Sequence, residues 1–280
     1  MSTDLKGKVA VVTGSSRGIG KGIALSLGEA GATVYVVGRT DATHKATVPL
    51  TGTVEDTANE VTQMGGVGIA ARADLRDDAQ TEALFQRIQT EQGRLDILVN
   101  SAWAGYEGLH DMSDFPFNQA FWERRLSYWD DNLFATRAAY IASALAARIM
   151  VKQESGLIVN ISHHVDPHPE TDRNAAYFNA KISTERLIAD IAGELRPHNI
   201  TSVALWPGLV RTEGIMLHEK FMDLSNSESP QFTGRAVVAL AADRDVLTKS
   251  GHSWWVSDLA NEYGFTDIDG KVYVPTWKPQ

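Results

Sequence analysis

The chain has 280 residues, of which 43% are hydrophobic, and a formal net charge of -9 at pH 7. An acidic chain without a Lys/Arg-rich block does not favour a nucleic acid or an anionic membrane as a partner, so we expect neither. Because cysteine is absent, disulfides, thiolate metal sites and cysteine nucleophiles are excluded. We find no apolar signal core in the first residues and no run that approaches the ~20 apolar residues of a bilayer span, which predicts a cytoplasmic protein.

The first element is a short apolar run at residues 9–12, which is typical of a buried parallel strand. A glycine-rich turn from Thr13 to Gly20 follows, and then a helical pattern that stops at Gly31. Strand, glycine turn and helix in this order place backbone amides and a helix N-terminus against a phosphate. The pattern therefore predicts a dinucleotide-binding turn with cofactor contacts from Gly14, Ser16, Arg17, Gly18, Ile19 and Gly20.

The second strand, predicted at residues 33–37, ends in Gly38-Arg39, where an NAD-preferring protein usually carries an acidic residue. Arg39 reverses that charge. Together with Arg17 it could hold the 2′-phosphate of NADP, because guanidinium groups pair well with phosphate oxygens. We therefore expect NADP(H) rather than NAD(H), although both residues could instead be ordinary surface arginines.

Later segments alternate between strand and helix patterns, which predicts a single α/β domain with helices on both faces of a mainly parallel sheet. After the third strand we expect Asp74 and Leu75 beside an adenine ring, and after the fourth Asn100-Ser101-Ala102 where a cofactor passes. The remaining strands are predicted at residues 67–73, 95–99, 157–161, 200–205 and 252–257, and helices at 54–64, 132–151, 176–195 and 232–242.

A tyrosine and a lysine four residues apart, Tyr177 and Lys181, share one face of a predicted helix. An ammonium held near a phenol favours the phenolate and brings its pKa closer to working pH, which makes a candidate proton donor and acceptor. The pair alone is weak evidence.

The aromatic-rich segment 103–131 is a further candidate, because some of its side chains could wall a substrate cleft rather than pack against the core.

These motifs together resemble the short-chain dehydrogenase/reductase family over residues 5 to 257. Thr13 to Gly20 fits its T-G-x-x-x-G-x-G motif, and Asn100-Ser101-Ala102 stands for its N-A-G-like strand end. Tyr177/Lys181 fits Y-x-x-x-K, and Pro207-Gly208 to Thr212 fits its P-G…T segment. Segments such as 93–105 and 205–208 are similar to a carbonyl-reducing branch of the family.

The resemblance implies a Rossmann-like, doubly wound, seven-stranded sheet in one domain, residues 1–280, and a role for several side chains. Tyr177 would give a proton, Lys181 would lower its pKa and hold the nicotinamide ribose, and Asn132 would order a water beside the lysine. Thr212 would meet the nicotinamide carboxamide. Further cofactor contacts are expected from Asn100, Ala102, Pro207, Gly208 and Val210.

The serine region departs from the family pattern. Many members carry the carbonyl-polarising serine about thirteen positions before the tyrosine, whereas Ser162 lies fifteen before Tyr177. Ser162 is the only hydroxyl at this strand end, so we assign it the polarising role, with His163 or His164 as the alternative donor. We expect no metal, because these two histidines and His168 lie in a Pro-interrupted loop without carboxylates at helical spacing.

We therefore expect an NADP(H)-dependent oxidoreductase that moves a hydride between the nicotinamide and a carbonyl or secondary alcohol by a Ser-Tyr-Lys-Asn mechanism. The alternative is a dinucleotide-binding sensor or scaffold that has lost turnover. A sugar epimerase or dehydratase is disfavoured by the glycine spacing. We also expect a substrate flap at about 211–230, a C-terminal tail at 258–280, and a homodimer or homotetramer; the sequence identifies neither the substrate nor the direction.

Overall fold

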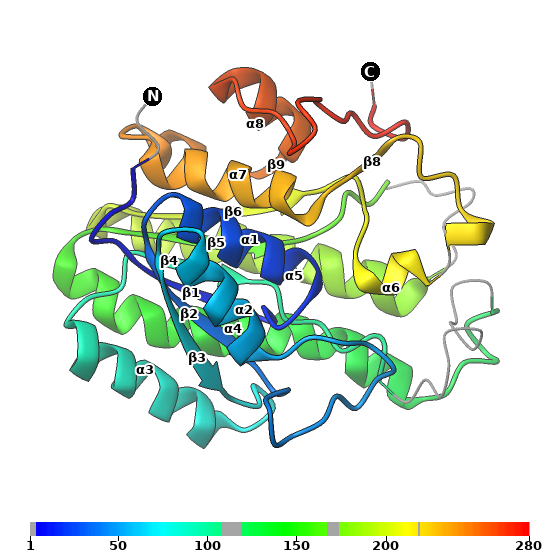
Figure 1. The fold of residues 1–280 in the computed structure, drawn as a ribbon, viewed down its shortest axis with the longest axis horizontal. Coiled ribbons are helices and arrows are strands. Elements are labelled where there is room, and N and C mark those ends of the chain that lie inside the picture. Colours follow the sequence, from blue (N-terminus) through cyan, green and yellow to red (C-terminus); the bar gives the residue numbers. More distant parts are fainter. Residues whose placement is uncertain (1–3, 108–118, 167–173, 218, 280) are drawn as a thin grey trace.

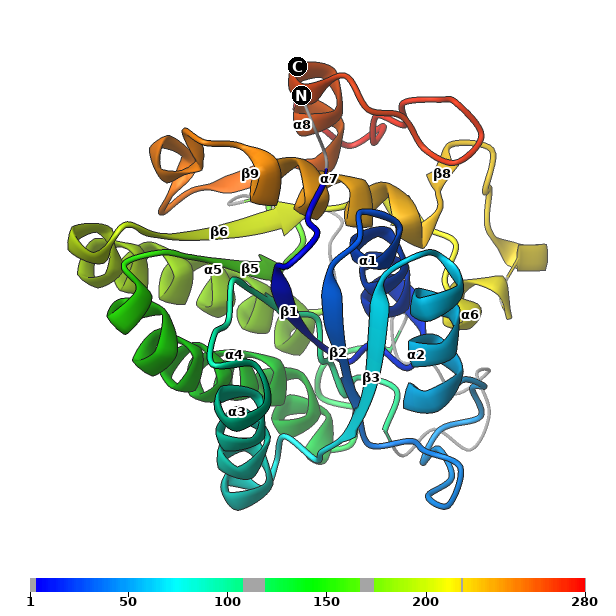
Figure 2. The same cartoon turned by 60° about the vertical axis from the view of Figure 1, so that its left-hand side comes forward.

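The computed structural model describes residues 4–107, 119–166, 174–217 and 219–279. They form a sheet of seven parallel strands flanked by helices (Figures 1 and 2). A separate sheet has two strands. In sheet order the strands are β3 (Val67–Arg72), β2 (Thr33–Gly38), β1 (Val9–Thr13), β4 (Ile97–Asn100), β5 (Gly156–Ile161), β6 (Ile200–Trp206) and β9 (Ser253–Trp255). The predicted fold class is confirmed.

The central strands are apolar throughout because both of their faces are covered. In β1, Ala10 and Val12 pack into one core, whereas Val9 and Val11 pack into the other. The first core lies under α1 (Gly18–Glu29), α2 (Val54–Gln63), α7 (Pro230–Ala242) and α8 (Val256–Tyr263). The second core lies under α3 (Asp78–Gln92), α4 (Ser127–Gln153) and α5 (Ala175–Leu195), on the other side of the sheet in Figure 2.

The last strand and the tail after it differ from the sequence prediction for a physical reason. The last strand was expected at residues 252–257, but only Ser253–Trp255 pair with the end of β6, and helix α8 starts at Val256. Strand β6 ends before Pro207, which has no amide hydrogen to donate. The hydrogen-bonded pairing of β6 with β9 therefore stops there, and β9 ends at Trp255. The expected tail at 258–280 therefore begins inside a helix.

The expected flap contains more regular structure than the sequence suggested. Residues Leu209–Val210 (β7) and Ser227–Glu228 (β8) pair as short parallel strands, and α6 (Glu213–Met216) lies between them. These elements are two to four residues long, too short for apolar periodicity to reveal.

Helix α4 is long and apolar enough to cross a membrane by length and composition, although we expected no such run from the sequence. This is weak evidence for a span, because a core helix meets the same criterion. Ala142, Ala146 and Met150 of α4 are buried in the second core. The expected absence of a membrane partner stays a prediction.

Buried carboxylates tie the flap and the tail to the domain. Glu228 accepts a hydrogen bond from the amide of Gly208 at 3.1 Å, and Asp267 accepts one from the amide of Ser229 at 2.7 Å. Burial raises the pKa of Glu228 to about 8. The folded state therefore holds this proton more tightly than the unfolded chain, so ionisation of Glu228 lowers stability as the pH rises from about 4.5 to 8.

We expect Glu228→Gln to remove this pH dependence, because the amide keeps an acceptor for Gly208 but cannot ionise. The melting temperature of the variant relative to wild type should rise between pH 5 and pH 8, by at least several degrees at pH 8, because each kcal/mol shifts the melting temperature of a domain of this size by about 2–4 °C. Calorimetry at several pH values measures the difference in melting temperature between the variant and wild type. The contributions of the other titrating groups are the same in both proteins and cancel in this difference. A difference that does not change with pH would contradict the assignment.

Candidate functional site

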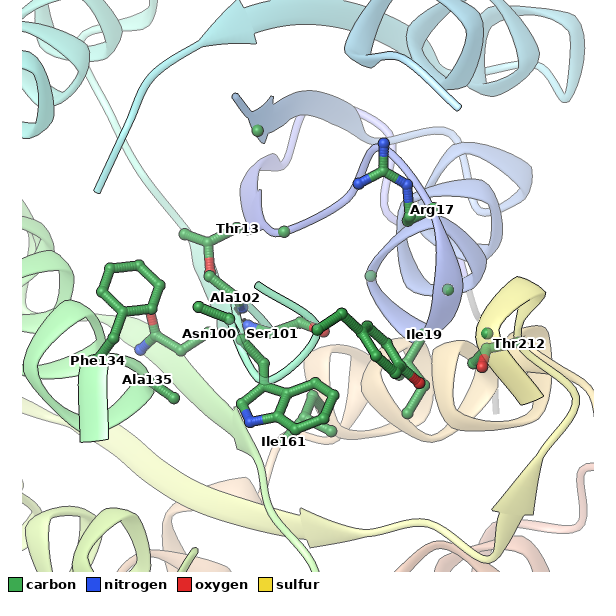
Figure 3. A pocket seen from close by; sticks show the side chains of 18 of the residues that line it. Thr13, Arg17, Ile19, Asn100, Ser101, Ala102, Phe134, Ala135, Ile161 and Thr212 are labelled. Atoms are coloured by element: carbon green, nitrogen blue, oxygen red, sulfur yellow. Dashed lines mark hydrogen bonds between the residues drawn. The ribbon is translucent and has the colours of Figure 1, made fainter. Parts of the chain in front are cut away.

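A cavity of about 410 Å³ opens at the carboxyl edge of the sheet, where β1, β4, β5 and β6 end beside the start of α1. In Figure 3, Thr13, Asn100, Ile161 and Thr212 surround it from separate elements. Most of the predicted cofactor residues line it: Gly14, Ser16, Arg17, Gly18, Ile19, Gly20, Arg39, Asp74, Leu75, Asn100, Ala102, Tyr177, Lys181, Gly208, Val210 and Thr212. The described residues that line the cavity do not include Pro207, Asn132 or Ser162.

The glycine turn is shaped by close backbone approach. Gly14 has φ +66°, and a Cβ there would lie 2.7 Å from the Cα of Ala102. Gly18, at φ +61°, starts α1, and its amide donates to the Glu213 carboxylate at 2.8 Å. A helix N-terminus that already holds an anionic oxygen fits the pyrophosphate of a dinucleotide.

Both predicted phosphate-binding arginines lie at the cavity, but each is engaged by the chain. The Nε of Arg17 donates to the Thr51 carbonyl at 2.8 Å, and its Nη2 donates to the Gly52 carbonyl at 2.9 Å. Arg39 forms an ion pair with Glu107. Burial lowers the pKa of Arg17, as expected for a cation held away from bulk water.

Tyr177 and Lys181 lie one turn apart on α5, with the lysine Nζ 5.4 Å from the centre of the tyrosine ring. The lysine Nζ donates to the carbonyl of Ile161, at the end of β5, at 3.1 Å. Burial raises the pKa of Tyr177 and lowers that of Lys181 to about 8, while Glu185 opposes the latter change. From the sequence we expected the nearby ammonium to lower the pKa of Tyr177. That expectation left out the loss of solvent around the buried phenol, which raises its pKa.

The structure does not place Ser162 where the sequence put it. Its hydroxyl is buried and donates to the Glu185 carboxylate at 2.8 Å, away from the cavity lining. His163, the next residue, lines the cavity, and its ring centre lies 5.8 Å from that of Tyr177. Successive side chains leave a strand on opposite sides, so only one of these neighbours can face the cavity.

The two histidines differ in environment. Burial, with smaller effects from Lys181 and His164, lowers the pKa of His163 to about 4, so its imidazole is neutral and can donate one hydrogen bond. The ring of His164 lies 4.9 Å from that of Trp206 and 5.1 Å from that of Trp255. This arrangement brings His163, not His164, to Tyr177.

Asn132 is fully buried on α4 and bonded within the protein. Its amide nitrogen donates to the Tyr128 carbonyl at 2.8 Å, and its oxygen accepts from Trp103 Nε1 at 3.1 Å. Asn100 similarly donates to the Asn160 side chain at 2.7 Å. The role of Asn132 beside Lys181 therefore stays a prediction. In the structure its side-chain oxygen accepts a hydrogen bond from Trp103.

Aromatic rings surround Tyr177 in the cavity. Trp103 lies 5.8 Å from Tyr177 and 4.9 Å from Tyr106, measured between ring centres. Trp277, which comes from the C-terminal tail, lines the cavity 6.2 Å from His163. The sequence analysis missed Trp277 because no local pattern links a tail to a site; residues 108–118 of the aromatic-rich segment lie outside the described residues.

Two acidic side chains at the site also escaped the sequence analysis. Glu185 lies one turn beyond Lys181 on the same face of α5, a spacing that could have revealed it. Glu213 follows the predicted Thr212, but no pattern in the sequence links its carboxylate to the amide of Gly18. In the described part of the chain no group of three metal-ligating side chains occurs, and His168 lies outside it.

The chain is similar to several known proteins. A family model described as short chain dehydrogenase matches residues 8–222. The Mus musculus protein Dehydrogenase/reductase SDR family member 1 is 40% identical, over 97% of this chain and 86% of its own. A metagenomic short-chain oxidoreductase in complex with NADP superposes with a TM-score of 0.69 and 26% identity, over 90% of this chain and 96% of its own.

A 7α-hydroxysteroid dehydrogenase, solved with NADH and 7-oxo glycochenodeoxycholic acid, superposes with a TM-score of 0.73 over 91% of this chain and 94% of its own. At 23% identity this likeness shows the fold alone. The two solved structures carry different nicotinamide cofactors, NADP in the first and NADH in the second.

We expect the imidazole of His163 to stay neutral down to about pH 5, because the buried ring loses solvation when charged. Nitrogen-detected NMR of the histidine side chains, with His163→Gln to assign the resonance, should give a pKa of about 4. Titration of this resonance near the ordinary value of about 6.5 would contradict the burial argument.

Proposed function

Because the chain belongs to the short-chain dehydrogenase/reductase family, we propose that it transfers a hydride between NADP(H) and a carbonyl compound or secondary alcohol. The observation that carries the proposal is that Tyr177 and Lys181 line the same cavity as the glycine turn of α1. A titratable pair beside a dinucleotide site suits a reaction in which a hydride and a proton move to adjacent atoms.

In this reaction the nicotinamide, when bound, supplies or accepts the hydride. Tyr177 gives its hydroxyl proton to the carbonyl oxygen during reduction and takes it back during oxidation. Its raised pKa keeps the proton on the phenol until negative charge develops on that oxygen. Lys181, with a pKa of about 8, is mostly charged at pH 7 and stabilises the phenolate that remains.

We assign polarisation of the carbonyl oxygen to His163 in place of Ser162. A neutral imidazole that lines the cavity beside Tyr177 can donate a hydrogen bond to an oxygen that the tyrosine also reaches. Ser162 instead donates to Glu185. The Ser-Tyr-Lys-Asn mechanism expected from the sequence thus becomes a His-Tyr-Lys proposal, with Asn132 fixing Trp103 in the wall.

NADP(H) is favoured over NAD(H) because Arg17 and Arg39 both line the adenosine end of the cavity and no acid follows β2 directly. A cytoplasmic location and a homodimer or homotetramer are proposed on the sequence composition and the family resemblance. The rival function, a dinucleotide-binding sensor without turnover, is disfavoured because the tyrosine and lysine are retained together at the cavity.

If Tyr177 is the proton donor, Tyr177→Phe keeps the ring but removes the hydroxyl, so turnover should fall by about 10² or more. NADPH oxidation against a panel of ketones and aldehydes measures it, while NADPH affinity should barely change. Tyr140→Phe, at an exposed position on α4, is the matched control. Equal turnover by the Tyr177 variant and wild type would show that the mechanism is wrong; wild type that binds NADPH but reduces nothing would favour the sensor.

The polarising residue can be identified by comparing His163→Ala with Ser162→Ala. Loss of one oxyanion donor costs about 10² to 10³ in turnover, and we expect this loss for His163→Ala. Ser162→Ala should lower turnover by less than about tenfold, because its hydroxyl bonds Glu185 rather than the cavity. Thermal melting checks that both variants fold, and the opposite ranking would return the role to Ser162.

A further inference from the structure

Two carboxylates of the chain already bind the two groups that would bind the phosphates of the proposed cofactor. The amide of Gly18, at the start of α1, donates to Glu213 at 2.8 Å. The guanidinium of Arg39, after β2, pairs with Glu107. The first is the position for the pyrophosphate, which NADP(H) and NAD(H) share, and the second is the position for the 2′-phosphate, which only NADP(H) has.

Glu213 is seated firmly against the glycine turn. Thr212 caps α6 by accepting from the amide of Ile215 at 3.3 Å, which orients the first turn that carries Glu213. Gly214 lies against Tyr106, since a Cβ there would be 2.6 Å from the tyrosine oxygen. Within the described residues, the first turn of α1 contains no acidic side chain and Arg17 supplies no side-chain cap, so the carboxylate comes from the flap.

Glu107 is held by more than Arg39. Its carboxylate also accepts from the hydroxyl of Thr47 at 2.9 Å, and the same hydroxyl accepts from Arg39 at 3.3 Å. The Glu107 side chain is 16% exposed, so solvent screens this pair less than a surface pair. Glu213 and Glu107 both act electrostatically on Arg17 as well, which places all three within one charged region.

We propose that Glu213 and Glu107 are counter-anions that the cofactor's phosphates must displace, so that Glu213 sets the affinity for both dinucleotides and Glu107 limits the preference for NADPH over NADH. A carboxylate and a phosphate repel each other at one donor, so one leaves when the other binds. Departure of Glu213 would release α6 from the glycine turn and couple the flap to cofactor binding. The inference rests on the proposed function.

The test is a fluorescence titration of wild type, Glu213→Gln and Glu107→Gln with NADPH and with NADH. Glu213→Gln should lower the Kd of both dinucleotides by about tenfold, because glutamine keeps the acceptor but removes the charge. Glu107→Gln should lower the Kd of NADPH by about tenfold and leave that of NADH unchanged. Glu219→Gln, an exposed change of equal charge in the same flap, is the control and should alter neither.

A second measurement separates displacement from a purely structural role. Without cofactor, Glu213→Gln should melt about 1–3 °C lower than wild type, because α1 loses a charged group at its N-terminus. Tighter binding by a less stable protein supports displacement. Weaker or unchanged binding by Glu213→Gln, or equal effects of Glu107→Gln on both dinucleotides, would overturn the inference alone; no binding of either dinucleotide to any of the proteins would overturn the proposed function with it.

Discussion

Parallel pairing of the seven strands is the constraint on which the site depends, because it brings the carboxyl ends of β1, β4, β5 and β6 to one edge of the sheet. Each strand of this central group must then return by a helix on one face or the other. As a result the glycine turn, which begins α1, and the face of α5 that carries Tyr177 and Lys181 meet at one cavity, although about 160 residues separate them.

Burial decides the electrostatics of this cavity more than any single pair of charges. Removal from water raises the pKa of Tyr177, lowers that of Lys181 and keeps His163 neutral. The raised pKa of Tyr177 suits a group that holds its proton until negative charge develops beside it, whereas the lowered pKa values of Lys181 and His163 mean that these two groups lose their protons more readily. Glu185 lies behind the lysine and raises its pKa, while it also takes the hydroxyl of Ser162 away from the cavity.

The sequence predicted what is local and missed what depends on distant contacts. The glycine turn and the Tyr177/Lys181 pair are short patterns with fixed spacing, so they could be recognised before their neighbours were known, but the direction of the tyrosine pKa was predicted wrongly. The direction of the Ser162 side chain depends on Glu185, and the anion at Gly18 comes from Glu213, 195 residues later. The last strand was predicted too long because its length is set by the end of β6, which no pattern within residues 252–257 reveals.

We propose that a hydride passes between a nicotinamide and a carbon bonded to oxygen, beside Tyr177. Its most direct test uses NADPH deuterated at each C4 position in turn, with mass spectrometry of the alcohols formed from a panel of ketones. We expect deuterium from one of the two C4 positions, and not the other, on the carbinol carbon, because a nicotinamide held in the cavity would present one face of its ring to the substrate. Alcohol that contains no deuterium with either cofactor would contradict it.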